Sequence, residues 1–138
     1  MKNTLVDAGP LIALFDKDDF YHQQILEFLK SYEGHLYTTW PVITETLHLL
    51  SFSVEVQLDF LKWLDRGGLR IFKFDQSILK RVINVTKKYN DLPVDFADAS
   101  LIAVAEREDI KDIISIDSDF NVYQTDKGIF LNNIFLSS

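Results

Sequence analysis

Four carboxylates in this chain stand at places where the sequence predicts that strands end and helices begin. Asp7 and Asp117 each follow a short apolar run directly, and Glu45 and Asp98 lie in the early turns of two helical patterns. Carboxylates held close together repel one another, and a bound divalent cation can neutralise them. The four residues therefore predict a site for a metal ion.

The chemistry that such a site would perform follows from its oxygen ligands. Mg²⁺ prefers oxygen ligands, keeps several waters and also binds phosphate oxygens. It can activate water against a phosphodiester, and two ions about 4 Å apart can serve the attacking and leaving oxygens separately. The five glycines match neither phosphate-loop pattern. The chain has no cysteine, which excludes thiol catalysis and Cys-ligated zinc.

Each acidic residue also has a purely structural interpretation, because the chain contains 21 Asp and Glu residues. Asp7 could cap the helix that follows it, and Glu45 could be an ordinary exposed helix residue. Asp95 and Asp98 resemble an N-cap with a second acid at the third helical position. Asp117 could be a turn residue.

Histidine and tryptophan add no clear chemistry. His22, His35 and His48 share no metal-ligand spacing, so we interpret them as structural or surface residues. We interpret Trp40 and Trp63 as core residues rather than as platforms on which nucleic-acid bases stack.

Short β-type runs alternate with helical patterns along the chain, and these elements must position the acids. The predicted strands cover residues 4–6, 36–38, 69–74 and 113–116, with a last strand in the tail 129–136. The predicted helices cover residues 11–15, 20–32, 40–50, 54–65, 77–89 and 95–108, with a break at 90–93. This alternation predicts an α/β fold, a three-layer α/β/α sandwich with a central, mostly parallel sheet.

The predicted fold explains how distant acids could meet. In open parallel sheets, ligands bind outside the carboxyl ends of the strands. Asp7 and Asp117 follow strands and so face that edge. The helices that carry Glu45 and Asp98 should open toward the same edge.

Length and composition predict a single domain over residues 1–138. The N-terminal residues meet a charge too early for a signal peptide, and no apolar run reaches the roughly 20 residues of a membrane span. We therefore expect a soluble, cytoplasmic protein with no membrane association.

The 14 Lys and Arg residues against 21 Asp and Glu residues give a net charge of −7, which argues against nonspecific nucleic-acid binding. A bound cation or a basic partner protein would remove that objection.

The sequence resembles the PIN-domain family, and within it the VapC-like toxin ribonucleases of prokaryotic toxin–antitoxin pairs. The stretches that carry the resemblance are residues 5–14, 42–45, 92–101 with 105–107, and 115–120. Their order, spacing and flanking residues agree from about residue 3 to residue 136. The ordered set is much more specific than any one stretch.

The resemblance implies a PIN-like α/β/α fold and Mg²⁺- or Mn²⁺-dependent cleavage of RNA that leaves a 5′-phosphate and a 3′-hydroxyl. By position, Asp7, Glu45, Asp98 and Asp117 match the family's four catalytic, metal-binding acids. Asp95, one helical turn before Asp98, is an additional candidate ligand or a neighbour of the metal.

Supporting residues follow from the same resemblance. Ser115 would help to hold the loop before Asp117, and Thr44 would support Glu45. Asp119 is a weaker candidate for the role of Asp117. Basic residues must also grip the RNA, and the candidates are Lys17, Arg70 and Lys73.

Toxin status implies two protein contacts. One is a small antitoxin that places a basic residue in the acidic site, and the other is a homodimer formed through apolar helix faces around Leu49, Phe52 or Leu61.

The alternative is a non-catalytic or stand-alone PIN-domain protein that binds or processes RNA. A phosphatase of the haloacid dehalogenase type would require D-x-D after the first strand, where this chain has Asp7-Ala8-Gly9. The absence of a clamp insertion favours RNA over DNA.

Overall fold

A parallel β-sheet forms the centre of the computed structural model, which describes residues 2–92 and 94–136. In this described part, five strands pair in the order β3-β2-β1-β4-β5, all in parallel. Their bounds are β1 Asn3–Val6, β2 His35–Thr38, β3 Arg70–Ile71, β4 Asp112–Ile114 and β5 Asn132–Asn133. The predicted α/β class with a parallel sheet is confirmed.

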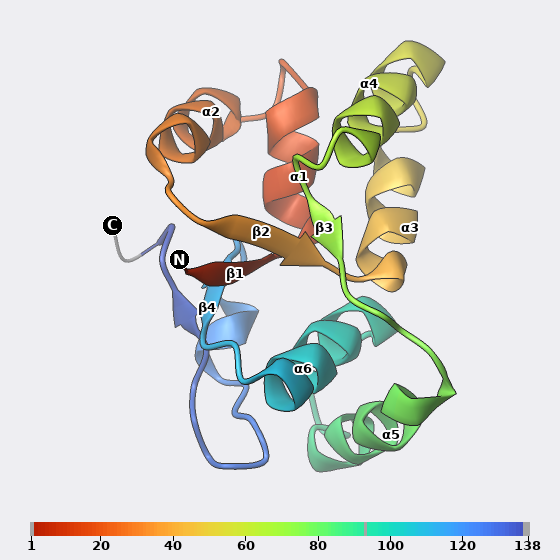
Figure 1. Cartoon of the computed structure of the whole chain (residues 1–138), viewed down its shortest axis with the longest axis vertical. Helices are drawn as coiled ribbons and strands as arrows, with labels where there is room; N and C mark the ends of the chain where they lie inside the picture. Colours follow the sequence, from red (N-terminus) through yellow and green to blue (C-terminus); the bar gives the residue numbers. More distant parts are fainter. Residues whose placement is uncertain (1, 93, 137–138) are drawn as a thin grey trace.

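Helices cover both faces of the sheet. Their bounds are α1 Ala8–Phe15, α2 His22–Ser31, α3 Trp40–Leu49, α4 Val54–Asp65, α5 Leu79–Lys88 and α6 Phe96–Glu108, with two 3₁₀ turns, η1 Gln76–Ile78 and η2 Ser118–Asn121. Figure 1 shows α1 to α4 on one side of the sheet and α5 and α6 on the other. Parallel strands require crossover connections, which these helices supply. None of the described helices is long and apolar enough to cross a membrane.

Among the described helices, α6 carries the most buried residues. Leu5 of β1 and Ile113 of β4 are fully buried, as are Leu101, Ile102 and Val104 of α6. Helix α6 contacts α5 and α3 as well, so it is covered on several sides. A helix held in this way fixes the position of the residues in its first turn.

The strand register brings three carboxyl ends together. Val6 at the end of β1 is paired with Ile114 at the end of β4. Thr38 ends β2, and its Oγ1 donates a hydrogen bond to the Val6 carbonyl over 2.8 Å. Asp7 follows directly, and its backbone N–H donates to the Ile114 carbonyl. This edge is where parallel sheets of this kind bind ligands.

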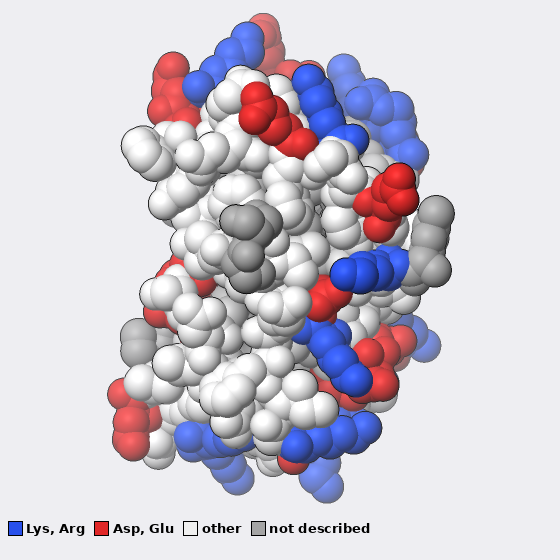
Figure 2. All heavy atoms as spheres, turned by 90° about the vertical axis from the view of Figure 1, so that its left-hand side faces the viewer, with Lys and Arg blue, Asp and Glu red and all other residues white. Residues whose placement is uncertain are grey.

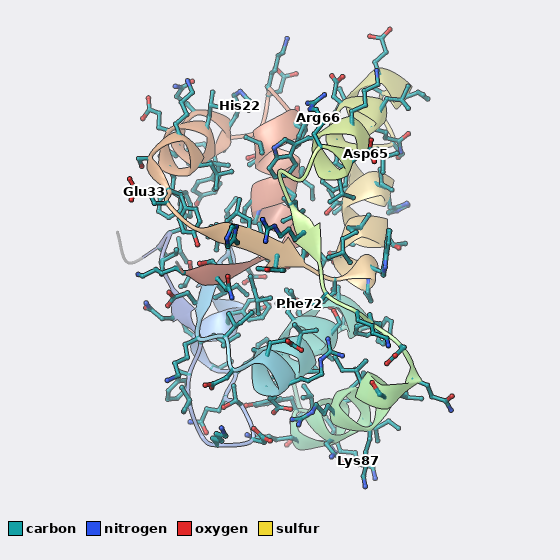
Figure 3. The ribbon with its side chains drawn as sticks, viewed as in Figure 1. His22, Glu33, Asp65, Arg66, Phe72 and Lys87 are labelled. Carbon is teal, nitrogen blue, oxygen red and sulfur yellow. The ribbon has the colours of Figure 1, made fainter. Side chains whose placement is uncertain are left out.

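Two predicted strands are shorter than expected. The alternating run 69–74 keeps only Arg70–Ile71 in the sheet, because the chain beyond it must cross to the helices on the other face. Phe72 lies just past β3 (Figure 3). Its ring stacks on that of Tyr37 at a centroid distance of 4.1 Å. The strand expected over 113–116 begins at Asp112 and ends at Ile114, because Ser115 already turns the chain toward η2.

The strand predicted in the tail is also displaced. The two apolar runs, 129–131 and 134–136, flank the true strand, Asn132–Asn133. Asn133 is buried, and its side-chain amide donates to the Ser115 carbonyl over 3.0 Å. Side-chain hydrogen bonds of this kind cannot be read from hydrophobic pattern. The break predicted at 90–93 is confirmed for residues 90–92, while residue 93 lies outside the described residues.

Candidate active site

Asp7 is a buried carboxylate at the junction of β1 and α1, and 8 % of its surface is exposed. Its Oδ1 accepts a hydrogen bond from the Ala8 backbone N–H over 2.8 Å, so it caps α1 as the structural interpretation expected. Its Oδ2 accepts a hydrogen bond from Ser115 Oγ over 3.1 Å. Both oxygens are therefore anchored, and the side chain has little freedom to move.

Burial dominates the electrostatics of Asp7. It raises the pKa of this carboxyl to about 6, although the hydrogen bonds from Ala8 and Ser115 act in the opposite direction. The negative charges of Glu45 and Asp117 add to the increase. These two acids therefore act on Asp7 through space, as the predicted convergence requires.

Asp98 is the most strongly perturbed carboxyl in this group. It lies in the first turn of α6, where its backbone N–H donates to Oδ1 of the N-cap Asp95 over 2.8 Å. Desolvation by burial, followed by repulsion from Asp7, Asp95 and other acids, raises its pKa to about 8. A helix N-terminus favours negative charge. At Asp98, burial and the surrounding carboxylates outweigh that effect.

Glu45 reaches the same region from the middle of α3. Burial raises its pKa, and the charge of Asp95 raises it further. The start of α3 is fixed against α6, because Thr39 Oγ1 and Ser100 Oγ share a buried hydrogen bond of 2.6 Å. The support that Thr44 is expected to give Glu45 stays a prediction, and the Thr44 hydroxyl donates to the Trp40 carbonyl within the same helix.

Asp117 stands at the exposed side of the group and caps η2. Its Oδ1 accepts a hydrogen bond from the Asp119 backbone N–H over 3.0 Å. Its own N–H donates to Ser115 Oγ over 3.1 Å. The expected role of Ser115 is confirmed, because its hydroxyl connects the Asp117 loop to Asp7.

The structure thus places the five predicted residues within reach of one another's charges, and we call them the acidic group: Asp7, Glu45, Asp95, Asp98 and Asp117. The charges of Asp7, Glu45, Asp95 and Asp117 each raise the pKa of another acid in the group. Asp98 receives most of this repulsion, and Asp119 acts on it as well. The group is drawn from the ends of β1 and β4 and from the helices α3 and α6. Elsewhere charge is mixed: the face shown in Figure 2 carries side chains of both signs around a largely uncharged centre.

The chemistry of this group fits a hard divalent cation. As the side chains stand, no three acids or histidines among residues 2–92 and 94–136 are arranged to hold a metal ion between them. Mg²⁺ does not need such a cage, since it is usually bound through one or two carboxylates and keeps several waters. The raised pKa values of Asp7 and Asp98 show that negative charge is costly here, and a cation would offset that cost.

Tyr123 lies close enough to the acids to be affected by their charges, and this was not anticipated. It is buried, with its ring held edge-on against Tyr89 and Phe120 at centroid distances of 5.1 and 5.4 Å. Burial raises the pKa of its hydroxyl, and the charges of Asp98 and Asp119 raise it further. Its sequence position carries no signal for this role, because only the fold brings it beside these acids.

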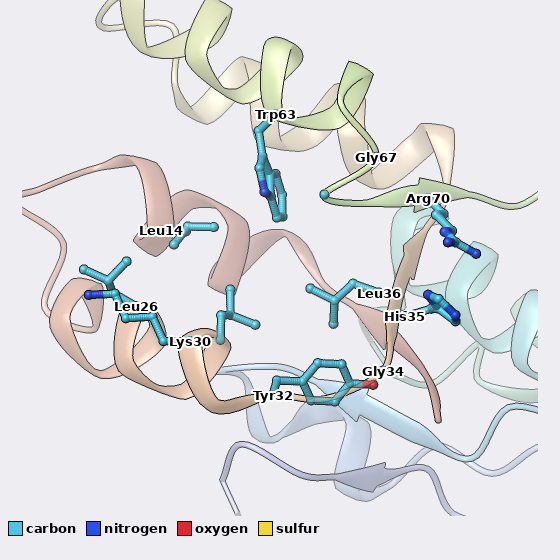
Figure 4. A pocket seen from close by; sticks show the side chains of 12 residues that line it. Leu14, Leu26, Lys30, Tyr32, Gly34, His35, Leu36, Trp63, Gly67 and Arg70 are labelled. Carbon is cyan, nitrogen blue, oxygen red and sulfur yellow. The ribbon is translucent and has the colours of Figure 1, made fainter. Parts of the chain in front are cut away.

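The expected basic residues are less well placed. Arg70 begins β3 and lines a separate pocket of about 330 Å³ with His35 and Trp63, away from the acids (Figure 4). Lys17 follows the far end of α1, whose near end carries Asp7. Lys73 pairs with Asp75 over 3.3 Å. The structure therefore does not support Arg70 or Lys17 as residues that grip a substrate at this site.

Comparison with known proteins gives the class of the chain. The profile of the PIN domain matches residues 4–125, and the chain belongs to this family. The chain is 24 % identical over 115 residues to ribonuclease VapC26 of Mycobacterium tuberculosis, a match that covers 82 % of this chain and 85 % of that protein. The resemblance stated from the sequence is confirmed.

Two solved structures have a similar fold. One is VapC20 of M. tuberculosis, described as a sarcin–ricin loop cleaving toxin, with a TM-score of 0.78, 18 % identity and coverage of 86 % of this chain and 92 % of that one. The other is a toxin–antitoxin complex from Klebsiella pneumoniae, with a TM-score of 0.65, 16 % identity and coverage of 84 % and 88 %. At such identities the likeness concerns the fold.

Proposed function

We propose that this chain is a Mg²⁺- or Mn²⁺-dependent endoribonuclease that hydrolyses RNA phosphodiester bonds at the acidic group. The observation that carries the proposal is the placement of Asp7, Asp98 and Asp117 at one edge of the parallel sheet, after β1, in the first turn of α6 and after β4. Burial and neighbouring acids raise the pKa of Asp98 to about 8. Perturbed groups of this kind gather at functional sites. The PIN-domain match and the similarity to ribonuclease VapC26 support the same reaction class.

The acids have distinct roles in the proposed reaction. Asp7, Glu45 and Asp98 would hold the ion directly or through water. Asp117, which is exposed at the open side, would complete the site or orient the attacking water. Asp95 caps α6 and contributes negative charge at the rim. When bound, the ion supplies Lewis-acid stabilisation of the phosphate and lowers the pKa of water.

The reaction itself is a hydrolysis. The oxygen of water forms a bond to phosphorus, and the bond between phosphorus and the 3′-oxygen breaks. A proton goes to the leaving 3′-oxygen, which gives a 3′-hydroxyl and a 5′-phosphate. The anchored carboxylate of Asp7 holds its oxygens in place throughout, because Ala8 and Ser115 restrain both of them.

The first experiment is cleavage of a pool of structured RNAs with Mg²⁺, with Mn²⁺ and with a chelator. Asp7→Asn and Asp98→Asn are the test variants, and Asp65→Asn, at the exposed end of α4, is the matched control (Figure 3). We expect cleavage that requires metal and falls at least 100-fold in both test variants but not in the control. Metal-dependent RNA binding without cleavage would favour the non-catalytic alternative.

We further propose that the chain is the toxin of a toxin–antitoxin pair. The support comes from the similarity to VapC proteins and from the net charge of −7, which suits a small antitoxin with a basic segment for the acidic group. Co-purification of the neighbouring gene product, and loss of RNA cleavage in that complex, would test it. A partner that leaves cleavage unchanged would contradict it.

A homodimer is proposed on a different surface. Leu49, Phe52, Val54, Leu58 and Leu61 are all exposed on α3, α4 and the turn between them, and we propose that they make up one apolar patch. Patches of this kind mark protein interfaces. Replacing Phe52 and Leu58 with Glu should convert a dimer to a monomer in light-scattering measurements, and a parent protein that is already monomeric would contradict the proposal.

A further inference from the structure

A groove opens beside the acidic group, between the first turns of α3 and α6. It measures about 720 Å³, within the range of about 300 to 1,000 Å³ that ligand sites occupy. The residues that define its character are Trp40, Glu45, His48, Phe74, Asp95 and Phe96. Three of these six are aromatic, and two belong to the acidic group described above.

Trp40 and Phe96 are unusually exposed for large aromatic residues. They are 54 % and 55 % exposed, and each is the first residue of its helix. The prediction that Trp40 belongs to the core is therefore wrong. Phe74 supports Phe96 edge-on, with a centroid distance of 5.8 Å. Exposed aromatic residues that gather in one groove are a recurring mark of a binding surface.

The two helices are fixed relative to one another at this groove. The buried hydrogen bond between Thr39 and Ser100 joins the cap of α3 to the second turn of α6. Trp40 follows Thr39 directly, and Phe96 lies one turn before Ser100. The spacing of the two rings is thus set by the fold and does not have to be arranged when a ligand binds, which lowers the entropic cost of binding.

The groove is continuous with the acidic group, because Glu45 and Asp95 line it. If a phosphodiester is cut at the acids, the nucleotides next to it must lie on an adjoining surface. The described residues that line the groove are rich in aromatic carbon and include two carboxylates but neither Lys nor Arg. This lining would repel phosphates, whereas uncharged bases stack well on aromatic rings.

We propose that the groove binds unpaired bases of single-stranded RNA next to the scissile bond, with Trp40 and Phe96 as the stacking platforms. This inference rests on the proposed ribonuclease function and assigns to it two residues that bind the bases next to the cut. Bases in an RNA duplex are already stacked on their neighbours, so recognition by stacking requires loops, bulges or ends. The groove therefore selects single-stranded segments over helical ones.

The test measures binding separately from cleavage. The full-length Asp98→Asn protein with Mg²⁺ is titrated with octamers of A and of U, with an octamer of abasic sites and with an RNA duplex. Binding is followed by tryptophan fluorescence, and Trp40→Phe distinguishes the signal of Trp40 from that of Trp63. One stacked base is expected to tighten binding by about 5- to 150-fold over the abasic chain. The A octamer should bind best, and it should quench Trp40.

Variants of the active enzyme complete the test. Trp40→Ala and Phe96→Ala should each raise KM for a single-stranded substrate about tenfold with little change in kcat, and Trp40→Phe should restore most of the loss. Phe20→Ala is the matched control, because Phe20 is 84 % exposed but lies in the turn before α2, outside the groove. Thermal unfolding of each variant identifies any loss that comes from misfolding.

The outcomes separate this inference from the proposed function. If both alanine variants cleave RNA normally and still bind the A octamer better than the abasic one, the proposed role of the groove is wrong and the proposed nuclease activity is unaffected. Base-dependent quenching of Trp40 in a protein that never cleaves RNA supports the groove and overturns the nuclease. Equal binding of the abasic and A octamers, or binding only of a basic peptide or a second copy of the chain, also overturns the groove.

Discussion

Ser115 Oγ lies 3.1 Å from Asp7 Oδ2 and donates a hydrogen bond to it, across 108 positions of sequence. The same hydroxyl oxygen accepts a hydrogen bond from the Asp117 backbone N–H. One small side chain after β4 therefore sets both the carboxylate after β1 and the loop that carries Asp117. Residues that hydrogen-bond to a metal ligand without binding the metal themselves often orient that ligand.

Ser115→Ala should weaken metal binding without abolishing the fold. Loss of its hydrogen bond removes a contribution that lowers the pKa of Asp7, so that pKa should rise further above its ordinary value. Loss of such an orienting partner typically costs about 10- to 100-fold in metal affinity or activity. The Mg²⁺ concentration for half-maximal cleavage measures the effect, with Ser118→Ala on the exposed turn as control. An unchanged Mg²⁺ requirement would contradict this role for Ser115.

The stability of the metal-free protein should fall as the pH rises. The pKa of Asp98 is 3.8 ordinarily and about 8 in the folded chain, so between these values the folded state holds a proton that the unfolded state releases. That contribution to stability is fully present below pH 4 and is lost as the pH rises to 8. Asp98→Asn should remove this pH dependence, because the amide stays neutral like the protonated carboxyl. At pH 8 it should stabilise the chelator-treated protein by on the order of 1–2 kcal/mol after solvent screening.

Urea unfolding of the parent protein and of Asp98→Asn at pH 5 and pH 8 checks this prediction. The difference between the two proteins should grow with pH, because other titrating groups cancel in the comparison. A difference that is the same at both pH values would show that Asp98 ionises normally.

Mg²⁺ should stabilise the folded chain at pH 8. A ligand that binds only the folded state at 100 times its Kd contributes about 2.7 kcal/mol, which is visible as a rise in Tm. At pH 5 the rise should shrink, because protonated Asp7 and Asp98 are poor ligands. Differential scanning calorimetry measures both, with NaCl at equal ionic strength and the Asp7→Asn variant as controls. An equal rise in Asp7→Asn would place the ion elsewhere.

Gly68→Ala should destabilise the fold far from the acids. A Cβ at residue 68 would overlap the indole of Trp63, and that ring has limited room because it packs against Phe15. Overpacking of this kind costs about 1–3 kcal/mol. Gly9→Ala is the control, since a Cβ there meets Ile116 only at 3.6 Å, an ordinary contact. Chemical unfolding compares the two, and equal stabilities would show that the Trp63 ring moves freely.

The acidic residues could be found from sequence because their signals are local. Asp7 follows an apolar run and Asp95 begins a helical pattern, and both turn out to be helix caps whose capping hydrogen bonds reach one and three residues along the chain. The parallel sheet then requires strand ends and helix starts to share an edge, which brings in Glu45 and Asp98. Local pattern and topology together were enough to predict that these acids lie toward the same edge of the sheet.

Other features depended on contacts between distant segments. The sequence indicated by itself an α/β fold, the order of most elements and five acids at one edge of the sheet. Only the tertiary structure decided that Trp40 is exposed, that Tyr123 lies beside the acids, and that the last strand is Asn132–Asn133. The physical reason is the range of the interactions. Strand alternation and helix capping depend on residues that are neighbours in the sequence. The burial of a side chain, the charges around it and the pairing of an edge strand depend on distant segments that the fold brings beside it.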